Sequence, residues 1–211
     1  SQPFDPERGR ALELGSKWQS EDARLGATAA LFDIRKRNVL TTDPLHPSYS
    51  VAAGEVRSRG LELDVNGQLS RHWRLSANLA LTDAEVTQDN TLQIGGGLLN
   101  VPRVNGSLLA VYEDTFANGQ RWGLGGGVTY VGERVGEART QPEAAPATPA
   151  FELPAYATAK LTGYWRLTPK VRLTLDVDNL FDRTYYASSW SRVWVTPGAP
   201  RTFTLGLQAR L

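Results

Sequence analysis

The sequence predicts an all-β protein in which antiparallel strands form a β-barrel that crosses a membrane. Three observations support this fold class. Nine segments alternate apolar and polar residues with a period of two. The connections between these segments alternate between short and long, and tryptophans gather beside the short ones. The sequence contains no convincing helical pattern.

Composition excludes several function classes. The 211 residues are 41% hydrophobic and 21% charged, with a formal net charge of +1. This is too apolar for a disordered chain and too neutral for a protein that binds nucleic acid by neutralising phosphates. Without cysteine there is no disulfide or thiolate metal site, and His46 and His72 alone cannot build a histidine-rich one. We therefore predict no bound metal and no cofactor.

Hydropathy gives no membrane helix, but it does not exclude membrane strands. No run reaches the roughly 18 apolar residues that a membrane helix needs, and residues 1–3 show no signal-peptide pattern. A membrane strand places its apolar residues at every second position and so escapes such a scan.

Each predicted strand has one apolar face. In chain order these faces run from Leu12 to Trp18, Leu25 to Leu31, Leu61 to Leu69, Trp73 to Leu81, Val104 to Tyr112, Trp122 to Tyr130, Ala155 to Trp165, Val171 to Val177 and Phe203 to Leu211. The second segment, about residues 24–39, changes face after Leu31, because Phe32 and Ile34 fall on the other side. We expect a β-bulge near Leu31.

The opposite faces carry charge in mid-strand, whereas the apolar faces are almost free of it. Charges inside lipid are costly, so we expect the polar face to meet a wet lumen or a plug. Its mid-strand charged residues are Glu62, Asp64, Arg74, Lys160, Arg172 and Asp176.

The connections alternate in length along the whole chain. The short ones are 20–23, 70–72, 115–120 and 168–170, and the long ones are 41–54, 87–101, 136–152 and 183–201. A soluble sandwich has no reason to place every long loop at one end, whereas outer-membrane barrels have short periplasmic turns and long extracellular loops.

Aromatic residues beside the short turns predict an interfacial girdle. Four tryptophans lie within a few residues of a short turn, each on the apolar face, and a tyrosine joins them: Trp18, Trp73, Trp122, Trp165 and Tyr112. The alternative, core tryptophans of a soluble β-protein, explains the faces but not the shared end.

Four stretches together resemble a known family. Residues 179–186 read Asn-Leu-Phe-Asp-Arg-Thr-Tyr-Tyr, and residues 197–201 read Pro-Gly-Ala-Pro-Arg before a closing strand. Residues 3–9 read Pro-Phe-Asp-Pro-Glu-Arg-Gly, and residues 56–63 read Val-Arg-Ser-Arg-Gly-Leu-Glu-Leu. In combination they resemble TonB-dependent outer-membrane receptors of the siderophore branch. Leu211 departs from the aromatic residue with which such barrels usually end.

The resemblance implies a transport function rather than an enzyme. It implies ferric siderophore uptake energised through TonB in the outer membrane of a Gram-negative bacterium, with iron bound only as part of the siderophore. Residues 1–211 would be the C-terminal part of one barrel domain, the last nine of 22 strands, without the plug and the TonB-contacting segment. Residues 185–189 look most like hydroxamate-siderophore receptors. The implied partners are the siderophore, TonB, outer-membrane lipid and lipopolysaccharide, with no nucleic acid.

The long loop 183–201 is the richest candidate for ligand capture. Aromatic residues with arginine suit a bulky, partly apolar, anionic chelate. The candidates are Trp190, Arg192, Trp194, Tyr186 and, from loop 41–54, Tyr49. The alternative is that these residues pack the loop or join the outer interfacial belt. The lumen residues Glu62 and Arg74 are expected to affect barrel stability or plug seating.

Other readings remain open. Asp176, Asp178 and Asp182 lack the spacing of a calcium loop, and the glycine triplets at 95–97 and 125–127 precede no helix. His46 is more readily a surface residue than a ligand contact. A porin-like or adhesin-like barrel without energised transport would share the strand pattern, and a soluble carbohydrate-binding β-protein is a remoter alternative.

Overall fold

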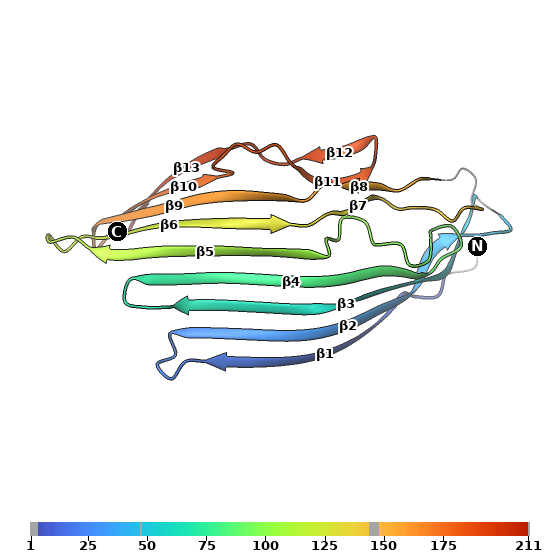
Figure 1. The fold of residues 1–211 in the computed structure, drawn as a ribbon, viewed down its shortest axis with the longest axis horizontal. Coiled ribbons are helices and arrows are strands. Elements are labelled where there is room, and N and C mark those ends of the chain that lie inside the picture. Colours follow the sequence, from blue (N-terminus) through green and yellow to red (C-terminus); the bar gives the residue numbers. More distant parts are fainter. Residues whose placement is uncertain (1–3, 47, 144–147, 211) are drawn as a thin grey trace.

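The computed structural model describes residues 4–46, 48–143 and 148–210, and strands form its regular structure (Figure 1). Nine of them build one antiparallel sheet in which spatial order follows chain order. They are β1 (Arg8–Gln19), β2 (Leu25–Thr42), β3 (Ser50–Gln68), β4 (Trp73–Gln88), β5 (Val104–Thr115), β6 (Arg121–Val131), β9 (Tyr156–Thr168), β10 (Val171–Asp178) and β13 (Thr202–Ala209). The predicted all-β, nine-stranded antiparallel sheet is confirmed.

The two ends of the sheet differ, as the spacing of the sequence predicts. Figure 1 shows the turns β1–β2, β3–β4, β5–β6 and β9–β10 at one end, which we call the turn end. The longer connections lie at the other end, the loop end. No helix in the described residues is long and apolar enough to cross a membrane.

The long connections are more ordered than predicted. The connection after β6 contains β7 (Arg134–Glu137) and β8 (Phe151–Leu153), and the connection after β10 contains β11 (Tyr186–Ser191) and β12 (Trp194–Pro197). Each pair forms an antiparallel hairpin outside the main sheet. β2 and β3 also extend further than expected and leave only residues 43–49 between them.

The β-bulge predicted near Leu31 is wrong. Leu31 pairs in unbroken register with Leu14 on β1 and Leu61 on β3, and the irregularity lies after Arg37, where Asn38 has a φ of 59°. Phe32 needs no bulge, because it pairs with Gly60, where an added Cβ would lie 2.8 Å from the Phe32 ring. The missing side chain makes room for an aromatic ring on the polar face.

The sheet buries little and exposes a continuous apolar face. Leu14 on β1 is 74% exposed and Leu205 on β13 is 78% exposed, with leucines of the intervening strands exposed between them. Among the described residues, the buried hydrophobic side chains are those of Val86, Leu153 and Val177. An apolar surface of this extent fits contact with lipid rather than water.

Some predicted features lie outside the described residues. These are Pro3 of the 3–9 motif, Pro47 beside His46, and the terminal Leu211.

Candidate functional site

The hairpins β7–β8 and β11–β12 pack against each other at the loop end (Figure 1). Arg134 of β7 and Ser189 of β11 are each only 4% exposed. The Arg134 guanidinium donates to the carbonyl oxygens of Tyr186 and, at 3.1 Å, of Ala187. Ser189 donates through its hydroxyl to the carbonyl of Gly136 at 2.5 Å. These buried hydrogen bonds hold one hairpin on the other, while Nη1 of Arg134 is buried without a partner among the described residues.

A side chain from a third connection completes this network. Asn100 has a φ of 60°, a conformation that asparagine tolerates well. Its amide donates to the carbonyl of Ser189 at 2.8 Å and accepts from the Ser189 N–H at 2.9 Å. We call Asn100, Arg134 and Ser189 the loop network. None of the three was predicted from the sequence, because their partners are about 50 to 90 residues away along the chain.

The predicted capture residues lie on the β11–β12 hairpin, except for Tyr49. Trp190 is 78% exposed and Trp194 is 72% exposed. Arg192, between them, pairs with Glu137 at 2.5 Å and donates to the carbonyl of Pro149 at 2.7 Å. The two indoles are therefore accessible, while the charge of Arg192 is already compensated.

The other two candidates have different surroundings. Tyr186 begins β11, is partly exposed, and provides a carbonyl to Arg134. Tyr49 lies in the loop between β2 and β3, where its ring makes an edge contact with His46. Only the β11–β12 residues form a single local group.

His46 has a local role in its loop. Its Nδ1 lies 3.2 Å from the carboxylate of Asp43, which also accepts from the backbone N–H of Leu45 at 2.8 Å. The Leu45 hydrogen bond is the main reason that the pKa of Asp43 lies below its usual value, and burial opposes it. These contacts support the reading of His46 as a surface residue.

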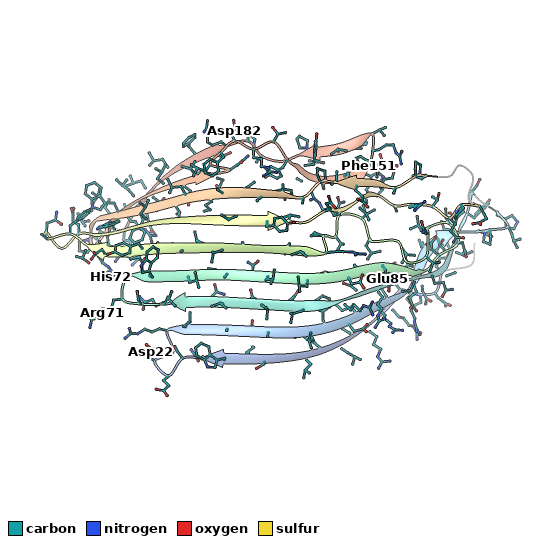
Figure 2. All side chains as sticks on the ribbon, viewed as in Figure 1. Asp22, Arg71, His72, Glu85, Phe151 and Asp182 are labelled. Carbon is teal, nitrogen blue, oxygen red and sulfur yellow. The ribbon has the colours of Figure 1, made fainter. Side chains whose placement is uncertain are left out.

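The sequence motif at 179–186 stabilises the turn after β10. Asn179 is buried with a φ of 48°, and its amide donates to the carbonyls of Arg183 at 2.9 Å and Ala199 at 3.0 Å. Asp182 accepts from the N–H of Arg201 at 2.8 Å. The motif therefore ties the start of the long connection to its end. Figure 2 shows Asp182 near this turn.

The structure does not assemble a metal site from the aspartates considered above. Asp176 and Asp178 both pair with Lys160, at 3.5 and 3.4 Å. Across the described part of the chain, no three His, Cys, Asp or Glu side chains group as metal ligands.

The aromatic residues at the turn end form a connected cluster. Ring centroids lie 5.3 Å apart for Trp73 and Tyr112, and 5.8 Å apart for Tyr112 and Trp122. Phe116 stacks on Trp122 at 5.7 Å and meets Trp165 edge-on at 6.2 Å. Figure 2 shows His72, which stacks on Tyr112, at this same end.

Trp18 lies apart from that cluster. It occupies the apolar face of β1 beside the first short turn, and its register partner is Ala27. The interfacial role of all five girdle residues stays a prediction.

The apolar face is not free of charge along its whole length, contrary to expectation. Beyond Leu31, Leu61 and Leu81, the same face of β1–β4 continues as an outer charged belt, which we define as Arg8, Arg10, Asp33, Arg35, Arg37, Glu55, Arg57, Arg59, Asp83 and Glu85. Arg57 pairs with Asp33, and Arg59 pairs with Asp83 at 2.8 Å. The strands extend beyond the apolar band, and there this face carries charged residues in place of apolar ones.

On the polar face, Glu62 and Arg74 are not partners. Glu62 is opposite Ala80, whereas Arg74 approaches the carboxylate of Glu113 on β5 at 3.4 Å. Any joint effect of Glu62 and Arg74 would have to act through other residues.

Comparisons with known proteins agree on one family. The model of the TonB-dependent receptor-like β-barrel matches residues 1–180. The chain is 46% identical over 206 residues to the metal-pseudopaline receptor CntO of Pseudomonas aeruginosa, covering 97% of this chain and 28% of that protein. It is 33% identical over 200 residues to the ferrichrome outer membrane transporter/phage receptor of Escherichia coli, covering 94% of this chain and 26% of that protein.

Solved structures show the same architecture. The ferric-catecholate import receptor Fiu of E. coli in its closed form matches with a TM-score of 0.78 and 28% identity, over 98% of this chain and 28% of that one. The siderophore receptor PiuA of Acinetobacter baumannii matches with a TM-score of 0.80 and 25% identity, over 98% of this chain and 29% of that one. The chain thus spans less than a third of each of these relatives.

Proposed function

Because this chain belongs to the family of TonB-dependent receptor β-barrels, we propose that it is part of an outer-membrane receptor that takes up a chelated metal ion. The observation that carries the proposal is the sheet itself. One face is apolar and exposed from β1 to β13, and the other carries ion pairs such as Lys160–Asp176. Such a sheet fits a wall between lipid and a wet interior.

We assign residues 1–211 to the C-terminal part of one barrel domain. Among the described strands, β1 and β13 each pair on one side only, and an open edge in lipid leaves backbone groups without partners. Further strands of the same receptor would close both edges, as the 22-stranded barrel expected from the resemblance requires. The plug and the TonB-contacting segment would belong to that remainder.

The ligand class is a metal chelate in which the metal is cargo. The names of the relatives point to pseudopaline, ferrichrome and catecholate complexes, so the hydroxamate subclass stays a prediction. We propose that Trp190 and Trp194 stack on the chelate, while the loop network and the Arg192–Glu137 pair keep their hairpin in place. A preorganised aromatic surface loses less conformational entropy on binding.

Two further partners follow from the proposal. TonB would supply energy through the remainder of the receptor. Lipopolysaccharide would meet the outer charged belt, where Arg8 and Arg10 add positive charge beside the ion-paired arginines and can bind phosphate.

Energised uptake tests the function directly. The full receptor is produced in a Gram-negative strain that lacks receptors for these chelates, and accumulation of metal-loaded pseudopaline and of ferrichrome is measured with and without an uncoupler. We expect saturable accumulation of at least one chelate that the uncoupler abolishes. Accumulation that persists and does not saturate would instead establish a porin-like barrel.

A further inference from the structure

Three arginines stand side by side on the polar face near the turn end. Arg121 on β6 is the register partner of Arg166 on β9, and Arg166 is also the register partner of Arg172 on β10. Their chain neighbours Trp122, Trp165 and Leu173 occupy the apolar face, so all three arginines lie on the polar face. We call them the arginine row. Like charges directly opposite each other destabilise a sheet, so the row calls for an explanation.

The sheet itself compensates the row poorly. A cavity of about 240 Å³ is lined by Arg74, Glu113, Arg121, Tyr164, Arg166 and Arg172. Glu113 is the one carboxylate in this lining. It is already engaged by Arg74 at 3.4 Å and by the hydroxyl of Tyr164 at 2.8 Å. Within the described part of the chain, no salt bridge involves Arg121, Arg166 or Arg172.

One member of the row is held in position with a donor unused. The guanidinium of Arg172 lies over the Tyr164 ring, 4.2 Å from its centroid. Its Nε is buried and has no hydrogen-bond partner among the described residues. Tyr164 in turn packs over Gly123, where an added Cβ would overlap the ring. The cavity is therefore built around fixed side chains, and it leaves a buried donor unsatisfied, which is costly.

The position of the cavity narrows the choice of partner. The row adjoins the turns 116–120 and 169–170, at the opposite end of the sheet from the hairpins β7–β8 and β11–β12 (Figure 1). A ligand that arrives through the loops would reach it last. The relatives are more than three times as long as this chain, and their additional residues are available to fill the interior.

We propose that the arginine row is a dock for an acidic segment, bearing Asp or Glu side chains, in the part of the same receptor that fills the lumen. Guanidinium groups pair with carboxylates through two parallel hydrogen bonds, and three adjacent forks fit neighbouring carboxylates. The inference rests on the proposed function only in requiring a filled lumen. It does not depend on which chelate is carried.

Carbodiimide cross-linking in the full receptor tests the contact. The reagent joins a lysine amine to a carboxylate that touches it, so Arg121→Lys and Arg166→Lys keep the charge and introduce the reactive group. Glu113→Gln is combined with each to remove the neighbouring acceptor. The control is Arg71→Lys, in the turn between β3 and β4 and outside the cavity lining (Figure 2).

We expect peptide mapping to find an isopeptide bond from position 121 or 166 to an Asp or Glu outside residues 1–211, with none from position 71. A correctly inserted receptor that gives no such bond, or bonds only within residues 1–211, overturns the proposal. Insertion is checked by heat-modifiable migration on a gel, and energised uptake is scored separately. A failed cross-link with normal uptake therefore rejects the dock alone.

Removing the charge of Arg166 provides a second test, because the presence and the absence of a carboxylate partner predict different changes in the rate of protease cleavage. Without a partner, Arg166→Gln relieves repulsion and leaves the seating of the lumen-filling part unchanged or firmer. With a carboxylate partner, it removes a charged hydrogen bond, and we expect protease cleavage of that part to become about tenfold faster. Unchanged or slower cleavage would refute the dock. Protection of the parent receptor by inorganic phosphate alone would indicate a small-anion site and would also refute it.

Discussion

Removing the two exposed indoles of the β11–β12 hairpin should weaken chelate capture without weakening the fold. The double variant Trp190→Ala and Trp194→Ala is made in the full receptor. About three quarters of each side chain is exposed, so truncation removes little internal packing. Exposed substitutions of this kind change the free energy of unfolding by about 0.5 kcal/mol or less.

The loss in affinity should be much larger than the loss in stability. Tryptophans that contact a partner are frequent hot spots, and truncating one commonly costs more than about 1 kcal/mol. Two together should weaken binding by more than about tenfold, which corresponds to roughly 1.4 kcal/mol. The matched control is Val193→Ala at the tip of the same hairpin, where the side chain is 90% exposed.

Isothermal titration calorimetry measures the binding of metal-loaded pseudopaline and of ferrichrome to the purified receptor. This method does not depend on tryptophan fluorescence, which the substitutions would change. Heat-modifiable migration must first show that the variant is inserted and folded. Equal affinity in parent and variant for every chelate that the parent binds would show that Trp190 and Trp194 do not contribute to chelate binding. Because Arg192 is already paired with Glu137, Arg192→Gln is expected to act through loosening of the hairpin, with faster amide exchange in β11.

Three further predictions follow from the packing. Arg134→Met leaves the carbonyls of Tyr186 and Ala187 without their buried donor, so amide exchange in β11–β12 should accelerate at least tenfold, about 1.4 kcal/mol or more, while exchange in β5 stays unchanged. Gly60→Ala places a Cβ against the Leu81 carbonyl and the Phe32 ring, and it should lower the yield of inserted receptor, whereas Gly9→Ala, with open space around it, should not. Residues 1–211 alone, refolded in detergent, should fail to give a sharp monomeric barrel transition, because β1 and β13 leave open edges.

The sheet was predictable from the sequence because its determinants are local. Period two assigns a face to each residue from its neighbours alone, and Leu61 and Glu62 take opposite faces whatever the rest of the chain does. The short turns likewise make β1–β2, β3–β4, β5–β6 and β9–β10 neighbours directly. The predicted faces are confirmed by the register.

The loop end was less predictable because its determinants are distant. β7 and β8 pair across a proline- and alanine-rich connection that shows no alternation, and the burial of Arg134 depends on β11, 52 residues away. The bulge near Leu31 was mispredicted because the apolar Phe32 was read as a change of face. In the structure, Gly60 on the neighbouring strand accommodates the ring.

We propose that the outer charged belt and the aromatic cluster together set the position of the sheet in the membrane. On β4, eight residue steps separate Trp73 from Leu81, and Asp83 follows on the same face. At about 3.4 Å per residue this is roughly 27 Å along the strand. A tilt of about 40° reduces the height to roughly 21 Å, close to the apolar band of about 25 Å that surrounds such barrels. Asp83 and its partner Arg59 then lie just beyond the hydrocarbon, at the level of the headgroups. At that level a phosphate can bind the arginines of the belt. If the same charges lay a few residues closer to the turn end, they would be in lipid, at a cost of several kcal/mol.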